Sequence, residues 1–429
     1  MNVRCAGDGY YGTAAGAGGP VSLYVHFPFC VRKCRYCDFL SGPSDEDARQ
    51  RYLDALEREI RAKAAWLPGI RGAAGIPEAD TVFFGGGTPS LMTPRQLDHL
   101  MYVLSCAFRI DEDAEITMEC NPGTVDYGKL RAFCGSGINR LSVGVQSFHE
   151  DELRLLGRIH TAQQARQCIA DARRAGCANV SLDLMSALPG QSYERWMDNL
   201  SEAVLLGPDH ISAYSLILEE GTPLKEAYDK ARRSPENRPG APDGRSAAAS
   251  EDVLPPLPDE DEDRRMYHDT KIFLKEHGYR RYEISNYARP GYESRHNSGY
   301  WTGHPYLGLG LGASSYLIRG ATGRIRWSNT SDMDTYLREC DRPQTILSAA
   351  DNLSAEDQME EFMFLGLRRM RGVSERDFAA EFGRTMDEVY GEVLKRYCGL
   401  GLLRRAYGYI ALTDAGIDVS NTVMADFLL

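Results

Sequence analysis

Six short apolar runs alternate with segments of helical spacing through the first half of the chain. The runs are Val21–Phe27, Thr81–Phe84, Glu115–Glu119, Leu141–Val145, Val180–Met185 and His210–Leu216. Between them, apolar residues recur at helical intervals over Asp45–Trp66, Pro94–Ala107, Asp126–Cys134, Ala162–Ala175 and Tyr193–Leu206. Strands that alternate with helices build parallel βα units. We therefore expect an α/β fold, with a partial barrel of six units, (β/α)6, as its main part.

Changes in this pattern predict the domain organisation. Residues 1–19 are rich in Gly and Ala and are expected to form a flexible tail ahead of a barrel over 20–228. Residues 229–263 are rich in Pro, Ser and charge, which predicts a disordered insertion. An extension of the barrel follows over 264–350. Over 351–429, helical segments and two short strands around a Tyr–Gly turn predict a mainly helical, winged-helix-like C-terminal domain.

Charge and hydropathy narrow the possible surroundings of the protein. Lys and Arg number 49 against 61 Asp and Glu, a net charge of −12, which argues against a nucleic-acid binder and a polybasic membrane surface. No apolar run is long enough to span a bilayer, and the first twenty residues lack the pattern of a secretory signal. We therefore expect a cytoplasmic protein without a transmembrane segment.

One cysteine cluster carries the most specific chemistry. Of the 11 cysteines, eight are scattered and are expected to be small buried apolar residues, whereas Cys30, Cys34 and Cys37 fall within CVRKCRYC. A structural zinc site normally has four ligands, and no fourth ligand follows here. On a [4Fe–4S] cluster, three thiolates leave one iron open. That iron can chelate the amino and carboxylate groups of S-adenosylmethionine (SAM), so the spacing indicates a radical SAM protein.

Further candidate residues lie where the predicted strands end, which is where barrels of this kind place their active sites. FFGGGTP follows the second strand, and its glycines allow close approach of backbone groups to a ligand. Each of the other polar candidates also fits a turn, a cap, a surface position or core packing when it is taken singly. The candidates for binding SAM are Tyr24, Gly86, Gly87, Thr88, Glu119, Gln146, Arg158 and Asp183.

Several motifs together resemble the oxygen-independent coproporphyrinogen III oxidase family of radical SAM proteins. The motifs are YVHFPFCVRKCRYCDF, FFGGGTPS, MECNPGT, LSVGVQSF, LGRIH and DLMSALPGQ, in that order. The resemblance covers about residues 20–429 apart from the insertion. It implies that the three cysteines bind the cluster, that the eight candidates line the SAM site, and that Ile217 also lines it. It also implies a partial (β/α)6 barrel with a smaller C-terminal domain.

Three features favour one branch of this family, the heme chaperones of the HemW type. The oxidases carry a fourth cysteine where this chain has Phe39, and they have a longer extension ahead of the barrel. His296, Asn297, Tyr300 and Trp301 spell HNxxYW, which the chaperone branch links to heme. Imidazole is a common axial ligand of heme iron, so His296 is a candidate heme ligand, although a histidine hydrogen-bonded in a loop is the plainer interpretation.

The resemblance therefore implies a chaperone that binds heme and passes it to an acceptor protein. Any membrane contact would be peripheral and would come through that acceptor. Two alternatives stay open: an oxidase that decarboxylates coproporphyrinogen III to protoporphyrinogen IX, and a binding module without radical chemistry, in which the cluster is only structural or regulatory. The sequence leaves open the acceptor, covalent attachment of heme, turnover of SAM and the oligomeric state.

Overall fold

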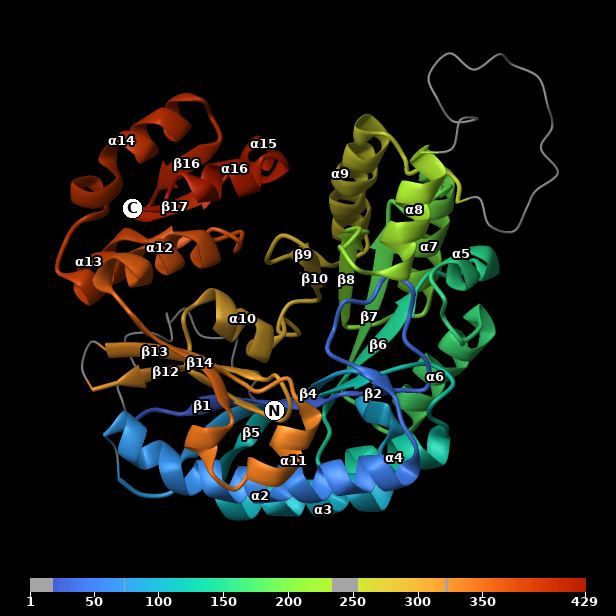
Figure 1. Cartoon of the computed structure of the whole chain (residues 1–429). Helices are drawn as coiled ribbons and strands as arrows, with labels where there is room; N and C mark the ends of the chain where they lie inside the picture. Colours follow the sequence, from blue (N-terminus) through green and yellow to red (C-terminus); the bar gives the residue numbers. More distant parts are fainter. Residues whose placement is uncertain (1–17, 73, 234–253, 321–322) are drawn as a thin grey trace.

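The computed structural model describes residues 18–72, 74–233, 254–320 and 323–429 (Figure 1). The predictions for residues 1–17 and 234–253 therefore lie outside the described residues. No helix within the described ranges is long and apolar enough to cross a bilayer.

The six predicted strands all form and pair in parallel in chain order, which confirms the predicted class of fold. Because every neighbouring pair is parallel, the carboxyl ends of the six strands meet at one end of the barrel. The strands are β1 (Val21–Phe27), β4 (Glu78–Gly86), β5 (Arg109–Cys120), β6 (Arg140–Gln146), β7 (Asn179–Ser186) and β8 (His210–Ser215).

The predicted helices connect these strands and cover the outside of the sheet (Figure 1). Asp45 caps the first of them, because its carboxylate accepts the backbone N–H of Ala48 at 2.7 Å. Gly137, Gly176 and Gly207 follow three of the helices with positive φ, as expected at helix ends. The predicted helices are α2 (Glu46–Arg71), α3 (Pro94–Ala107), α4 (Tyr127–Gly135), α6 (Ala162–Arg174) and α7 (Tyr193–Leu205). The short helix α5 (Glu150–Leu155) and a 3-10 turn at η1 (Pro89–Leu91) were not predicted.

Four more strands extend the sheet beyond β1, and their pairing was not apparent from the Gly-rich sequence. Of these, β11 is parallel to β1, and the next three are antiparallel. Gly308 lies where a Cβ would come within 2.2 Å of the carbonyl oxygen of Ser314, so the chain needs glycine there although glycine disfavours strands. The strands are β11 (Tyr306–Leu309), β12 (Ser314–Arg319), β13 (Gly323–Asn329) and β14 (Leu347–Leu353). Between β13 and β14 the chain forms α11 (Met333–Glu339) and the 3-10 turn η3 (Pro343–Thr345).

A fully buried ion pair joins this extension to α2. Lys63 Nζ lies 2.8 Å from Glu59 Oε1, and neither side chain is exposed. Lys63 also donates to the Gly308 carbonyl and to Asn329 Oδ1, each at 2.8 Å. Glu59 accepts the backbone N–H of Gly310 at 2.7 Å. Because both charges have several partners, the pair can stay ionised inside the core.

At the other edge of the sheet, two helices extend into the segment that was predicted to be a disordered insertion. Residues 229–233 belong to α8 (Pro223–Arg233), and α9 (Glu260–Glu276) begins within the segment predicted to be disordered. Asp259 caps α9, and four acidic residues occupy its first turn, where the helix dipole favours negative charge. After α9, the two-residue strand β9 (Arg280–Arg281) pairs with β10 (Asn286–Ala288).

The C-terminal helical region forms around a core of its own. Its short hairpin turns at Tyr407 and Gly408, both with positive φ, as the Tyr–Gly pair predicted. Helix α12 packs against α10 (Arg295–Trp301), which places this region over one end of the barrel (Figure 1). The elements are α12 (Ala355–Gly366), α13 (Glu375–Phe382), α14 (Met386–Gly399), α15 (Asp414–Asp418), α16 (Ser420–Ala425) and a sheet of β15 (Val373–Ser374), β17 (Tyr409–Leu412) and β16 (Leu403–Ala406).

The inner face of the barrel is polar, and one of its ends is closed. Along β1, Val21, Leu23 and Val25 join the core under the helices, so the alternate residues of this strand face inward. In the middle of β5, at the level where β1 begins, the carboxylate of Glu115 accepts the backbone N–H groups of Arg295 at 2.9 Å and of His296 at 3.0 Å. Helix α10 therefore covers the amino ends of the strands, and the candidate site lies at their carboxyl ends.

Candidate functional site

The three clustered cysteines lie together on the loop that follows β1. Cys30 is in β2 (Phe29–Cys30), which pairs with β3 (Gly42–Pro43), and the backbone N–H of Cys37 donates to the carbonyl of Cys34 at 3.4 Å. All three thiols are free and half-buried. Burial raises the pKa of Cys37, and the neighbouring thiols of Cys34 and Cys30 add to that rise.

The Gly-rich segment after β4 holds this loop in place. Gly87 donates its backbone N–H to the carbonyl of Phe27 and Thr88 donates to that of Phe29, both at 2.8 Å. Gly86 has φ of 105°, and a Cβ on it would lie 2.4 Å from the His26 ring. These glycines therefore allow the two loops to lie against each other, a closer approach than any side chain permits. The Thr88 hydroxyl donates to Cys30 Sγ at 3.5 Å.

Arg158 links the cysteine loop to the barrel. Its guanidinium donates to Cys34 Sγ at 3.6 Å, to the Gly144 carbonyl at 2.6 Å and to the side-chain oxygen of Asn121. The amide of Asn121 in turn donates to Thr88 Oγ1 at 3.0 Å. Both hydrogen bonds to cysteine sulfur therefore belong to one network of polar side chains. Donors of this kind stabilise thiolate over thiol.

Two carboxylates face each other inside the barrel. Glu119 accepts the backbone N–H of Gly86 at 3.0 Å. Burial and the nearby Asp183 raise the pKa of Glu119 to about 7, while that hydrogen bond opposes the rise. Burial also raises the pKa of Asp183, which accepts from the Ser142 hydroxyl at 3.2 Å. The buried Arg140 lowers the pKa of both acids, so it partly balances the two negative charges inside the barrel.

Two other predicted residues reach the same region. The Tyr24 hydroxyl lies 3.1 Å from Nδ1 of His26, and Glu119 adds to the rise that burial causes in the pKa of Tyr24. Gln146 has φ of 67°, which is uncommon outside glycine, and its side chain accepts from the Tyr214 hydroxyl at 3.1 Å. Ile217 differs from both, since its side chain is 71% exposed on the segment after β8.

His296 lies on α10, and its ring centroid is 6.5 Å from that of Tyr24 and 5.0 Å from that of Phe83. It is 1% exposed, and its two ring nitrogens lie 2.7 Å from Thr81 Oγ1 and 2.9 Å from the Tyr300 hydroxyl. Burial lowers the pKa of His296 to about 3. In this structure the ring is therefore neutral and occupied by partners within the protein, which agrees with the plainer interpretation of a hydrogen-bonded histidine.

Three residues of the site were absent from the sequence-based predictions: Asn121, Tyr214 and Arg140. A signal for Arg140 is present, because polar residues occupy alternate positions along β6 while Leu141, Val143 and Val145 enter the core. Asn121 follows the end of β5 directly, in the same position as other strand-end candidates. Nothing local distinguishes Tyr214 from a packing tyrosine.

The residues at the carboxyl ends of the strands fit a cluster with SAM. The possible ligands are three thiols in one loop, and two of them accept hydrogen bonds from Thr88 and Arg158. Glycines beside the loop leave no room for side chains where the two backbone segments meet. No three Cys, His, Asp or Glu side chains of the described ranges already converge as a metal site. The loop therefore offers three thiols, and the hydrogen bonds of Thr88 and Arg158 orient two of them.

Comparisons with known proteins agree with this geometry. Residues 24–203 match the model of the Radical SAM superfamily, and residues 353–419 match that of the HemN C-terminal domain. The chain is 34% identical to "Heme chaperone HemW" of Bacillus subtilis over 95% of this chain and 99% of that protein. It is 32% identical to the Escherichia coli protein of the same name, over 95% and 98% of the two chains.

Two further comparisons extend these matches. A cattle protein described as "Radical S-adenosyl methionine domain-containing protein 1, mitochondrial" is 34% identical over 95% of this chain and 87% of its own length. Among solved structures, the Escherichia coli coproporphyrinogen III oxidase HemN has a TM-score of 0.74 at 24% identity, covering 95% of this chain and 90% of that one. The last match confirms the fold.

Proposed function

Because this chain belongs to the HemW family of radical SAM proteins, we propose that it is a heme chaperone, which binds heme and transfers it to an acceptor protein. The observation that carries the proposal is similarity to HemW chaperones over 95% of the chain. Phe39 supports it, because this residue stands where the oxidase branch has a fourth cysteine and its side chain is 66% exposed beside the cysteine loop. We place the protein in the cytoplasm.

Cys30, Cys34 and Cys37 would hold a [4Fe–4S] cluster and leave one iron for SAM. When bound, the cluster and SAM supply one-electron chemistry at the sulfonium group. Thr88 and Arg158 orient two of the thiolates through the hydrogen bonds described above. Glu119 offers a carboxylate that would accept a hydrogen bond from the SAM amino group, and the Gly-rich segment keeps the backbone close to it. Tyr24, Gln146 and Asp183 complete the polar wall of the site.

The experiment that tests this function is a titration of the anaerobically reconstituted protein with heme, followed by addition of a heme-free acceptor protein. The expected result is saturable binding at about one heme per chain and loss of the bound-heme absorbance as the acceptor fills. The same preparation is then incubated with SAM, a reductant and coproporphyrinogen III. Formation of protoporphyrinogen IX would overturn the chaperone function in favour of the oxidase, and absence of heme binding would remove its basis.

A further inference from the structure

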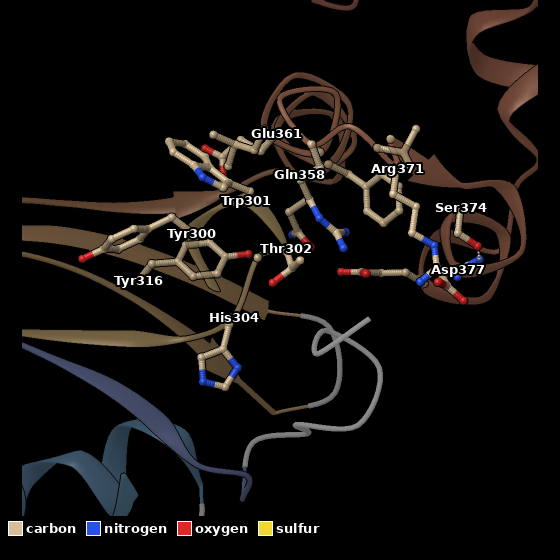
Figure 2. Close-up of a pocket in the computed structure, with 18 of the residues that line it drawn as sticks. Tyr300, Trp301, Thr302, His304, Tyr316, Gln358, Glu361, Arg371, Ser374 and Asp377 are labelled. Atoms are coloured by element: carbon tan, nitrogen blue, oxygen red, sulfur yellow. Dashed lines mark hydrogen bonds between the residues drawn. The ribbon is translucent and has the colours of Figure 1, made fainter. Parts of the chain in front are cut away.

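Two hollows border the C-terminal helical region, and they differ in charge. The first lies beside α10, where Tyr300 and Trp301 form part of its wall (Figure 2). Its lining contains three arginines and three carboxylates, so its charges balance. The second lies between α9, β9 and the start of α15, and we call it the basic groove; its volume is about 820 Å³. The described residues that line it include two lysines and three arginines but a single carboxylate, that of Asp414.

Asp414 holds two of these cations in place. Its carboxylate lies 2.6 Å from Nζ of Lys271 on α9 and 2.8 Å from a guanidinium nitrogen of Arg281 on β9. These ion pairs join the C-terminal helical region to the edge of the barrel, where Figure 1 shows α15 on the side that faces α9. The Arg281 side chain is 6% exposed and also donates to the Tyr267 hydroxyl at 3.1 Å. Asp414 therefore fixes one wall of the groove but balances only one of its five positive charges.

The other three cations have no carboxylate partner within the described part of the chain. Lys275 and Arg280 are exposed, and their side chains make no hydrogen bond or ion pair with the described residues. Arg404 donates to the carbonyl of Met370 at 3.0 Å, a neutral acceptor that leaves its charge unbalanced. Like charges on adjoining segments repel each other, and a bound anion removes that repulsion. In a chain whose net charge is −12, this local surplus indicates an anionic ligand.

The basic groove follows the edge of the large sheet. Within the described ranges β9 is the last strand of that sheet, with β10 as its strand neighbour on one side only. Arg280 and Arg281 are consecutive, and both line the groove. Because consecutive residues of a strand point to opposite faces, a groove that touches both runs along the edge of the strand. Such an edge can pair its main-chain groups with those of an extended peptide.

The uncharged part of the lining favours a peptide over a nucleic acid. Tyr279 is the one aromatic residue among the described residues that line the groove, and it is fully buried, so no ring is exposed for a base to stack on. Met370, Leu412 and Ile417 add apolar surface between the charges. This combination suits a segment in which acidic side chains alternate with apolar ones.

We propose that the basic groove binds an extended acidic segment of a partner protein. The main chain of the segment lies along β9, and its carboxylates lie on Lys275, Arg280 and Arg404. Planar guanidinium groups bind carboxylates through paired hydrogen bonds, and the local positive charge steers an acidic surface towards the groove. The inference holds whether or not the chain carries heme, because no residue of the groove belongs to the site at the carboxyl ends of the strands.

Fluorescence anisotropy of a labelled peptide of about ten residues, in which Glu alternates with Val, tests the site on the full-length protein. At about 0.15 M salt, which screens distant charges, the peptide should bind saturably. Paired Lys275→Glu and Arg280→Glu should weaken binding at least about tenfold, since two charge-assisted contacts become repulsive. Both side chains are exposed, so the variant should fold, which thermal unfolding checks. Paired Arg131→Glu and Lys395→Glu is the matched control: it changes the net charge equally at exposed positions outside the groove and should bind as the parent does.

Two further probes determine the class of ligand. The same peptide with Gln in place of Glu should bind at least about tenfold more weakly, because its side chains carry no charge. A single-stranded oligonucleotide of the same length is the competing ligand. Tighter binding of the oligonucleotide than of the Glu peptide, lost on charge reversal in the groove, would overturn the inference in favour of a nucleic acid. It would also be overturned by absence of binding of the Glu peptide, by parental affinity in the groove variant, or by an equal loss in the control variant.

Discussion

Substitution of Glu119 by glutamine should weaken SAM binding and stabilise the protein at the same time. The side chain faces the barrel interior, where burial and the adjacent Asp183 raise its pKa from 4.5 to about 7. A carboxyl group whose folded pKa lies above its unfolded value is penalised when it ionises in the folded state. Stability is therefore lost as pH rises from the unfolded pKa towards 7, and it stays reduced above that pH.

The magnitude follows from the size of this shift. Each pKa unit corresponds to about 1.4 kcal/mol, so ionised Glu119 destabilises the SAM-free protein by about 3 kcal/mol above pH 7. Glutamine has the same shape without the charge and keeps the acceptor for the Gly86 N–H. Glu119→Gln should therefore raise the free energy of unfolding by up to about 3 kcal/mol at pH 8, and by clearly less at pH 5.

SAM binding should change in the opposite direction. A hydrogen bond to a charged group contributes about 1.5–3 kcal/mol, so loss of the bond between the Glu119 carboxylate and the SAM amino group should weaken SAM binding roughly 10- to 100-fold. Because the ionised Glu119 carboxylate is the stronger acceptor for the N–H groups of the SAM amino group, parental affinity should fall about tenfold between pH 8 and pH 6. The glutamine variant should lose most of that pH dependence.

Calorimetry of SAM binding to the reconstituted protein, together with denaturant unfolding of the SAM-free protein, measures both effects. Glu115→Gln is the matched control, a buried carboxylate four residues earlier on the same strand. It accepts the N–H groups that begin α10, so its substitution should destabilise the fold by about 1–2 kcal/mol and leave SAM affinity unchanged. Parental SAM affinity that stays flat from pH 6 to pH 8 would refute the reasoning, as would destabilisation by Glu119→Gln at pH 8.

Three other substitutions probe the site and its support. Gly86→Ala places a Cβ 2.4 Å from the His26 ring and forces a left-handed φ on alanine. Iron content after reconstitution should therefore fall to less than about half. Full iron content with normal unfolding would show that the two loops need no such contact. Lys63→Met leaves Glu59 charged and buried, which should cost about 3–5 kcal/mol in denaturant unfolding, and a loss below about 1 kcal/mol would contradict the role of this ion pair. Cys34→Ser should abolish cluster binding in iron and sulfide assays yet move the melting temperature of the cluster-free chain only slightly, because the thiol is half-buried; a retained cluster would mean that another residue supplies the ligand.

Local patterns in the sequence were enough to identify the barrel and the cysteine loop. Apolar runs of strand length separated by helical spacing correspond to β1 and β4–β8 with their helices. Burial of one face of a helix or a sheet requires apolar residues at regular intervals, and the sequence shows those intervals directly. The three cysteines lie within eight residues, so their meeting on one loop needs no long-range contact. The Tyr407–Gly408 hairpin turn is local in the same sense.

Only the tertiary structure decided how distant residues share one site. Glu119 and Asp183 lie on strands separated by β6. The sheet register brings these two buried carboxyl groups near each other, and burial raises the pKa of both. Helix α9 begins inside the segment whose composition predicts disorder, because its N-cap and dipole outweigh composition. His296 faces Thr81 and Tyr300 inside the protein although its motif suggests heme iron. The direction of a side chain on a short helix is set by what the helix packs against, and a motif of six letters carries no information about that neighbour.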